Sequence, residues 1–228
     1  MSLPAFYRAP FAAHGAWLCF ICSDVNMPSN LLQEVLHAAV EKSFNRITID
    51  GDTSTNDTVL LMANGLSGVT VKAPAQREAF QKVLDDVLIR LAKMLVKDGE
   101  GATKLVEIIV NGASSDEDAD RVAETVSHSN LVKTALFGED ANWGRIVAAI
   151  GRADVPIDPN KIDIFFNDVQ MVKNGTGCGE IAEAEATKVL KKPEFSIRLD
   201  LKVGNGRATM LTCDLSIDYV KINADYRS

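Results

Sequence analysis

The chain has 228 residues and a formal net charge of −7, with 46% hydrophobic and 24% charged residues. This length can bury a substantial core in one large or two small domains, and the composition is that of a globular protein. The acidic balance argues against nucleic acid or an anionic membrane as a partner. No apolar run is long enough for a membrane span, and the start of the chain lacks the pattern of a secretory signal. We therefore expect a cytoplasmic protein.

Strands and helices alternate in the first half of the chain. We expect a strand at residues 17–23, a helix that begins at Pro28, a strand–loop–strand unit at residues 46–65, and a second helix from Pro74 to about Lys97. The apolar residues of both helices recur at helical spacing. They are Leu32, Val35, Leu36, Ala39, Val40 and Phe44 in the first helix, and Phe80, Leu84, Leu88, Leu91 and Leu95 in the second.

The second half predicts short strands interrupted by helices. The expected strands lie at residues 105–110, 131–137, 162–167, 169–173 and 219–223, and the expected helices at residues 115–130, 143–150 and 180–191. We also expect a hairpin between residues 194–203 and 207–213, because Gly204-Asn205-Gly206 is a strong turn signal.

This mixture of hairpins and helix-connected strands predicts an α/β fold with α+β character, in which helices pack on mixed sheets. We expect a divergent N-terminal segment at residues 1–16 and a main α/β domain at residues 17–150. A smaller C-terminal α/β domain at residues 151–228 is expected to close the site.

Neither the cysteines nor the glycines point to a metal or a cofactor. Cys19 and Cys22 have the spacing of a zinc or redox pair, but no second close pair exists and the segment predicts a buried strand rather than a helix start. We interpret these two residues, with Cys178 and Cys213, as reduced core side chains. The glycines between residues 175 and 179 do not follow a phosphate-binding pattern.

The most polar stretch is residues 50–57, which contain three carboxylates, three hydroxyls, one amide and one glycine between two apolar segments. These polar groups need partners, either the backbone through local turns or a bound ligand. Short polar loops held between strands often carry binding sites. A well-capped turn and a binding loop therefore both remain open.

Two further places could bind a ligand. Glu100 lies between Gly99 and Gly101, which would let a ligand approach a carboxylate able to bind an ammonium group or transfer a proton. The alternative is a solvated glutamate in a turn. Residues 223–228 could complete a polar pocket or simply fray. None of the three histidines lies near a serine or cysteine with a nucleophile signature, so no self-contained catalytic set is present.

Five ordered motifs stand out along the chain. They are SFNRITIDGDTSTND at residues 43–57, DGEGATK at 98–104, LVKTA at 131–135, NWGR at 142–145 and INADYRS at 222–228. Together they resemble the β chain of the ornithine acetyltransferase family, the bifunctional glutamate N-acetyltransferases of arginine biosynthesis. The resemblance extends from about residue 17 to the end of the sequence.

The resemblance implies an activity and a second chain. Members of this family are made as one precursor that cleaves itself before a threonine in an Ala-Thr-Met-Leu motif. That threonine becomes the N-terminus of the β chain and carries the acetyl group of N-acetylornithine to glutamate. The oxyanion hole comes from the α chain. The resemblance thus implies a heterotetramer with an α chain, and neither a metal nor a cofactor.

Aligned with the family motif, the run Gly15-Ala16-Trp17-Leu18 places Ala16, which has no hydroxyl, at the nucleophile position. By resemblance, Glu100, Asn223 and Ser228 contact the substrate. The residues implied to support the site are Asp52, Thr53, Thr55, Asn56 and Asp57.

Three hypotheses follow. The chain is the β portion of an acetyltransferase that is inactive without its α chain, or a non-catalytic remnant, or a module that binds acetylated amino acids. The face that the family buries against the α chain would then be covered by that chain, by residues 1–15 or by a second copy in a homo-oligomer, or be exposed.

Overall fold

The structure, a computed structural model, describes residues 5–8 and 17–225. The chain forms two compact units: unit 1 is Met1–Ile47 with Gly51–Leu95, and unit 2 is Thr48–Asp50 with Val96–Ser228. The units therefore do not divide near residue 150, where we expected a boundary. Ile150 is itself part of a core that continues on both sides of it in the sequence.

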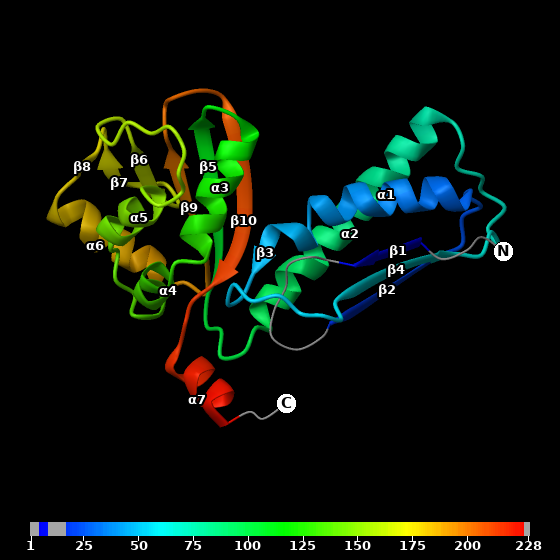
Figure 1. The fold of residues 1–228 in the computed structure, drawn as a ribbon, viewed down its shortest axis with the longest axis horizontal. Coiled ribbons are helices and arrows are strands. Elements are labelled where there is room, and N and C mark those ends of the chain that lie inside the picture. The colour runs from blue at the N-terminus through cyan, green and yellow to red at the C-terminus, as the bar shows by residue number, and fades with distance from the viewer. Residues whose placement is uncertain (1–4, 9–16, 226–228) are drawn as a thin grey trace. The chain divides into compact units, whose positions relative to one another are not determined.

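Unit 1 contains a three-stranded sheet in the order β1-β4-β2 (Figure 1). Its elements are β1 (Ala5–Arg8), β2 (Leu18–Ser23), α1 (Ser29–Glu41), the 3-10 turn η1 (Phe44–Arg46), β4 (Thr58–Ala63) and the larger part of α2 (Pro74–Lys97). Strand β2 is parallel to β4, and β1 is antiparallel to it. The sequence predicts both helices at these places because their apolar residues fall on one face, and residues such as Leu36 and Leu88 are fully buried.

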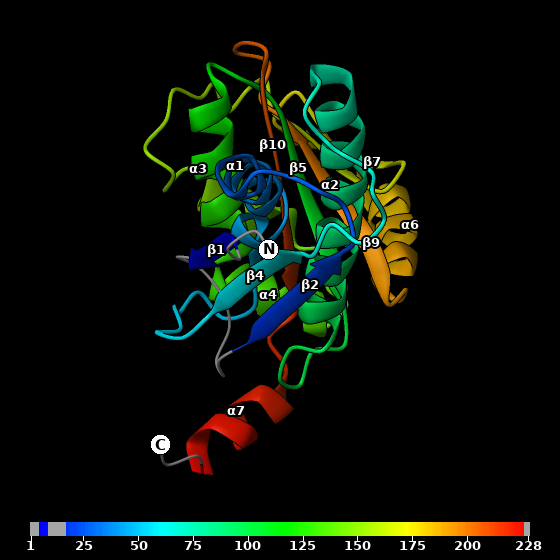
Figure 2. The same cartoon turned by 90° about the vertical axis from the view of Figure 1, so that its right-hand side faces the viewer.

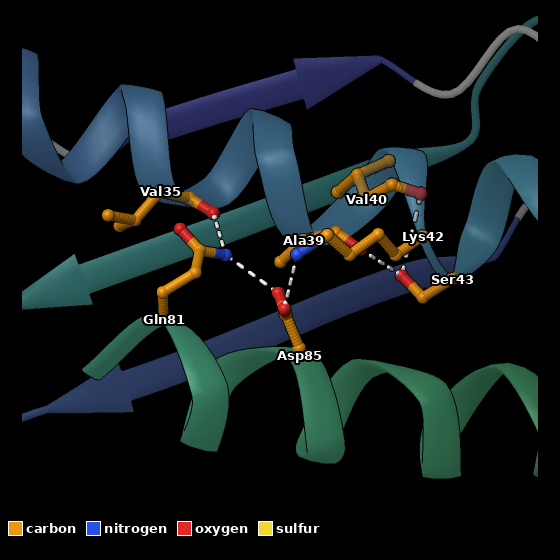
Figure 3. Close-up of polar contacts among 7 residues, drawn as sticks. All are labelled: Val35, Ala39, Val40, Lys42, Ser43, Gln81 and Asp85. Atoms are coloured by element: carbon orange, nitrogen blue, oxygen red, sulfur yellow. Dashed lines mark hydrogen bonds and ion pairs between the residues drawn. The ribbon is translucent and has the colours of Figure 1, made fainter. Parts of the chain in front are cut away.

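Helices α1 and α2 run side by side in front of the strands, and polar side chains join them (Figure 3). Gln81 on α2 donates from Nε2 to the Val35 carbonyl oxygen of α1, at 3.0 Å. Where α1 ends, the Ser43 hydroxyl donates to the Ala39 carbonyl oxygen at 2.7 Å. The Gln81 bond links α2 to α1, whereas the Ser43 bond holds the C-terminal turn of α1.

Strand β2 is not the buried strand that we expected. Leu18 and Phe20 are each 59% exposed, and Cys22 is exposed. The register pairs Phe20 with Leu60 and Cys22 with Met62, so these side chains share one face of the sheet. The opposite face carries the buried residues of β4, such as Val59 and Leu61. Helices therefore cover one face of this sheet, and an apolar face at β2 stays open.

The prediction that all four cysteines are core residues is correct only for one of them. Cys213 is buried and Cys19 is half-buried, whereas Cys22 and Cys178 are exposed. Burial raises the pKa of both Cys19 and Cys213, as expected for thiols held away from water.

Unit 2 is built on a seven-stranded sheet in the order β3-β10-β5-β9-β6-β7-β8. Its strands are β3 (Ile47–Thr48), β5 (Leu105–Ala113), β6 (Asp163–Phe166), β7 (Val169–Lys173), β8 (Thr176–Gly177), β9 (Glu194–Asp200) and β10 (Gly206–Cys213). Its helices are α3 (Asp116–Ser127), α4 (Asn130–Phe137), α5 (Trp143–Ile150), α6 (Glu180–Leu190) and α7 (Ile217–Asp225). Strand β5 is antiparallel to β10 and parallel to β9, so the expected mixed sheet with packed helices is confirmed.

Helix α3 packs on β5 and β10, and α6 packs on β6 and β7 (Figures 1 and 2). Helix α7 lies beyond the end of β10 and away from the sheet, near the C-terminus. No helix among the described residues is long and apolar enough to cross a membrane.

Residues 194–213 do not form the expected hairpin, because β5 lies between β9 and β10. The turn signal was correct, but the chain reverses around the end of β5. Val203 and Gly204 both donate their backbone N–H to the Gly112 carbonyl oxygen at that end. A turn motif shows where a chain reverses but not which strands pair. The apolar strand β5 lies between β9 and β10 because both of its edges are then hydrogen-bonded.

Two predicted strands are helices. Residues 130–137 form α4, whose N-cap Ser129 accepts from the Val132 N–H at 3.5 Å. Residues 217–225 form α7, where the Ser216 hydroxyl accepts from the Tyr219 N–H at 3.1 Å. Short apolar runs do not distinguish a strand from a buried helix, but a serine three residues ahead of the bonded N–H is a helix-start signal.

Candidate functional site

The structure brings Glu100 and Asn223 together in unit 2, although 123 residues separate them in the sequence. The Asn223 amide donates from Nδ2 to Glu100 Oε2 at 2.8 Å and to the Tyr219 carbonyl oxygen at 3.0 Å. Both Glu100 and Asn223 are half-buried. The amide is therefore held with its N–H groups used, which leaves Asn223 Oδ1 and Glu100 Oε1 as hydrogen-bond acceptors. A carboxylate oxygen and an amide oxygen are the kinds of acceptor that suit the ammonium group of an amino acid.

Gly101 allows the loop that carries Glu100 to lie close to helix α7. Its φ of +65° is in the left-handed region, which favours glycine, and a Cβ here would lie 2.6 Å from Tyr219 N and 2.7 Å from Ser216 Oγ. The glycine-flanked loop therefore contacts the backbone at the start of α7 directly. Because of this close contact, Glu100 lies next to the face of α7 on which Asn223 lies.

Asp50 joins the same cluster from a third segment of unit 2. The Tyr219 hydroxyl donates to Asp50 Oδ2 at 3.0 Å, across 169 positions of sequence. One helical turn of α7 thus connects the first residue of the polar stretch 50–57 with the loop at Glu100. Tyr219 was not identified from the sequence, where its segment predicted a strand.

The link between β10 and α7 is held in place by buried polar groups. Asp214 Oδ1 accepts from the backbone N–H of Thr103 and of Lys104, each at 2.8 Å, and Asp214 Oδ2 accepts from the Thr103 hydroxyl at 2.6 Å. Three bonds to one carboxylate fix the strand that follows the Glu100 loop against the segment that leads into α7.

Lys133 on α4 also contacts the segment between β10 and α7. Its side chain is 1% exposed, and Nζ donates to Thr212 Oγ1 at 3.0 Å and to the Cys213 carbonyl oxygen. Leu215 N donates back to the Lys133 carbonyl oxygen at 3.1 Å. Burial lowers the pKa of Lys133, an effect that the adjacent Cys213 thiol and the nearby carboxylates oppose.

In the sequence, Lys133 stands out only as part of the LVKTA motif at residues 131–135. A lysine between apolar residues of a short helix was the available signal, because a buried lysine must find hydrogen-bond partners. Those partners lie 79 and 80 positions away.

The rest of the polar stretch, residues 51–57, belongs to unit 1. Ser54 Oγ accepts from the Asn56 N–H at 3.2 Å, and the Thr58 hydroxyl donates to the Asn56 carbonyl oxygen at 3.0 Å. The expected local turn bonding is therefore present. Asp52, Thr53, Thr55 and Asn56 are exposed.

Asp57 differs from its neighbours because it is fully buried. Its Oδ1 accepts from the Trp17 N–H at 3.2 Å, and the Trp17 carbonyl oxygen accepts from Thr58 N at 3.2 Å. The Trp17 ring also packs on Phe44, with ring centroids 4.5 Å apart. The residue next to Ala16 is thus fixed through both backbone groups and its side chain. Burial raises the pKa of Asp57, and hydrogen bonds from Trp17 and Ser54 oppose this effect.

Two predicted site residues, Ala16 and Ser228, lie outside the described residues. Within residues 5–8 and 17–225, no group of three or more histidine, cysteine or acidic side chains could hold a metal ion.

Comparison with known proteins places these residues in a family. The ArgJ family matches residues 12–228. The arginine biosynthesis bifunctional protein ArgJ of Syntrophotalea carbinolica is 54% identical over 92% of this chain and 54% of its own length. The glutamate N-acetyltransferase of Methanocaldococcus jannaschii is 44% identical over 96% of this chain and 56% of its own length. The chain therefore spans about half the length of these relatives.

The fold also matches a solved structure. A crystal structure of the arginine biosynthesis bifunctional protein ArgJ from Bacillus halodurans has a TM-score of 0.87 and 43% sequence identity. The match covers 92% of this chain and 100% of that chain. The fold class implied by the resemblance is confirmed.

We expect Asp57→Ala to lower the free energy of unfolding by about 1–3 kcal/mol, because the Trp17 N–H loses its acceptor. Asp57→Asn should cost clearly less, since its amide oxygen can still accept this bond. Urea denaturation at pH 7 measures both values. Equal losses in the two variants would contradict a role for the Asp57 acceptor.

Comparison of Asp57→Asn with the unmodified chain tests the raised pKa of the buried Asp57 carboxyl group. Because the pKa of Asp57 is raised from 3.8, its protonated form stabilises the fold at low pH, and this stabilisation is lost as the pH rises through the folded pKa. Asp57→Asn should therefore gain stability relative to the unmodified chain as the pH rises from about 3.8. A constant difference across that range would contradict the raised pKa.

Gly101→Ala should separate the Glu100 loop from α7, because the added Cβ overlaps the backbone of Tyr219. The left-handed backbone alone costs an alanine about 1–2 kcal/mol. Hydrogen exchange should show faster exchange of α7 amides in this variant. Gly68→Ala is the control: its φ of +71° is similar, but no atom lies within 4 Å of the added Cβ, so α7 exchange should be unchanged. Equal effects of the two substitutions would exclude the proposed contact.

Proposed function

Because the chain belongs to the ArgJ family, we propose that it is the β-chain-like part of a glutamate N-acetyltransferase of arginine biosynthesis. In this proposal the acetyl group passes from N-acetylornithine to glutamate. The observation that carries it is the Asn223–Glu100 hydrogen bond at 2.8 Å, which joins a carboxylate and an amide that each keep one acceptor oxygen. These oxygens suit the ammonium group that ornithine carries.

The proposed site assigns binding to Glu100 and Asn223, with Ser228 completing it. Asp57 holds the backbone of Trp17, the residue that follows position 16 in the sequence. We assign the same supporting role to the remaining residues of the polar loop, which are Asp52, Thr53, Thr55 and Asn56.

The proposed reaction needs a nucleophile that this chain lacks. A threonine oxygen would attack the acetyl carbonyl carbon of N-acetylornithine, the C–N bond would break, and ornithine would leave with the proton. The glutamate amine would then attack the acetyl ester and regenerate the hydroxyl. Ala16 cannot form this ester, so we propose that the chain alone binds substrate without turnover.

We further propose that this chain binds a partner that corresponds to the half of the relatives' length that it does not match. The open apolar face in unit 1, formed by Leu18, Phe20 and Met62, suits such a partner, because two of these side chains are 59% exposed. The partner would also supply the oxyanion donors. A cytoplasmic location agrees with the exposed thiols of Cys22 and Cys178, which persist where thiols are kept reduced.

Ala16 favours a second candidate function. A chain that keeps the acceptor pair but not the hydroxyl would be a binding module for N-acetylated amino acids. The two candidates differ in whether a threonine at position 16 restores chemistry.

The test supplies both missing parts. Ala16→Thr, mixed with the half of the Syntrophotalea carbinolica protein that this chain does not match, should transfer acetyl from N-acetylornithine to glutamate. Ala16→Val is the control of the same shape without a hydroxyl, and it should be inactive. Sedimentation of the mixture should show a complex.

Turnover by the unmodified chain alone would contradict the proposal, as would equal activity of the valine and threonine variants. Binding of N-acetylornithine without restored turnover in the complex would favour the binding module.

A further inference from the structure

Helix α2 carries a second row of apolar side chains besides the row that it buries. The buried row follows Leu84, Leu88 and Ala92. The second row follows Val83, Val87 and Met94, which are 64%, 40% and 63% exposed. At 3.6 residues per turn, the two rows lie about 100° apart around the helix. A row of large exposed apolar side chains on one helix face marks an interaction surface.

Two half-buried residues, Phe80 and Leu91, lie between this exposed row and the buried row. With them the exposed row forms an apolar stripe within about 80° of arc. We call it the α2 stripe, and its members are Phe80, Val83, Val87, Leu91 and Met94.

The neighbouring helix α1 contacts a different side of α2. Lys42, just after α1, donates to Asp85, and Gln81 donates to a backbone carbonyl oxygen of α1 (Figure 3). Asp85 lies about 160° around α2 from Val87. The α2 stripe therefore points away from α1.

The α2 stripe is symmetrical about its central residue. Phe80 and Met94 each lie seven residues from Val87, and Val83 and Leu91 each lie four residues from it. A second α2 helix in the opposite direction would therefore place Phe80 against Met94, Val83 against Leu91, and Val87 against its own copy. Sulfur–aromatic and aliphatic contacts of this kind are favourable. A two-fold axis at Val87 makes the contact self-complementary and closed.

Two charged residues beside the α2 stripe obey the same symmetry. Asp86 and Arg90 are exposed and lie along one edge of it. Among the described residues, the ion pairs of α2 are those of Arg77, Asp85 and Lys97, so the charges of Asp86 and Arg90 remain available. In the reversed copy, Arg90 lies within about 3 Å of Asp86 along the helix axes, on the same edge.

The charge complementarity identifies the occupant. We propose that the α2 stripe binds a second copy of this chain in an antiparallel contact centred on Val87, with Asp86 of each copy paired to Arg90 of the other. Chains with a net charge of −7 repel one another, and two ion pairs of opposite sign at the contact offset this repulsion locally. The proposal is independent of acetyl transfer, because it uses none of the residues assigned to that function.

The first experiment tests the ion pairs by sedimentation of the full chain over a concentration series. The unmodified chain should show a monomer–dimer equilibrium. In Asp86→Arg the facing groups are both positive, and in Arg90→Asp they are both negative, so each variant alone should dimerise roughly tenfold or more weakly. A mixture of the two variants should form a one-to-one heterodimer, because each facing pair again has opposite signs.

Three results of this experiment would overturn the proposal. They are a chain that stays monomeric at every concentration, single variants that dimerise as well as the unmodified chain, and a mixture that stays monomeric.

The second experiment tests the apolar contact. Val87→Asp places two carboxylates at the two-fold axis and should abolish the dimer. Ile181→Asp is the matched control, because it makes the same change at an exposed apolar residue of α6 and should leave the dimer intact. Far-ultraviolet circular dichroism checks that each variant keeps its helices. Loss of the dimer in Phe20→Asp but not in Val87→Asp would place the second copy on the open face at β2 and would overturn the proposal.

Discussion

The proposed site depends on one close backbone contact. Gly101 adopts a left-handed conformation against the start of α7, where a Cβ would overlap Tyr219 N. This contact lies beside the hydrogen bond between the Glu100 carboxylate and the Asn223 amide. The glycines that flank Glu100 therefore serve packing as well as access for a ligand. A side chain at position 101 would move the helix that carries half of the acceptor pair.

Helix α7 lies away from the sheet, so polar contacts rather than core packing hold its first turn. Asp214 bonds to the strand after the Glu100 loop, and Lys133 bonds to the end of β10. Both are buried ionisable side chains, which need well-formed hydrogen bonds to be stable away from water. Asp57 plays a comparable part in unit 1, where it fixes the backbone beside Ala16. In each case a buried ionisable group fixes a backbone segment that leads to a proposed functional residue.

Periodicity predicted most of the helices, because α1 and α2 place their apolar residues on one face. It failed at α4 and α7, which are short and whose signals are capping serines rather than a long apolar pattern. The hairpin prediction failed because local turn chemistry does not state which strands pair. Glu100 could be identified from its flanking glycines. Tyr219 and Lys133 could not, because their partners lie 169 and about 80 positions away.

In the proposed function, binding and chemistry are assigned to different residues. We propose that Glu100 and Asn223 bind an ammonium group and that the covalent step needs a hydroxyl at position 16, where this chain has Ala16. The most direct measurement is a double-mutant cycle with Glu100→Gln and Asn223→Ala, read as the affinity for N-acetylornithine by calorimetry. The account predicts a coupling energy of about 1 kcal/mol or more between the two positions, as for residues in one hydrogen-bonded network. Additive effects within about 0.5 kcal/mol, or affinity unchanged by either substitution, would contradict it.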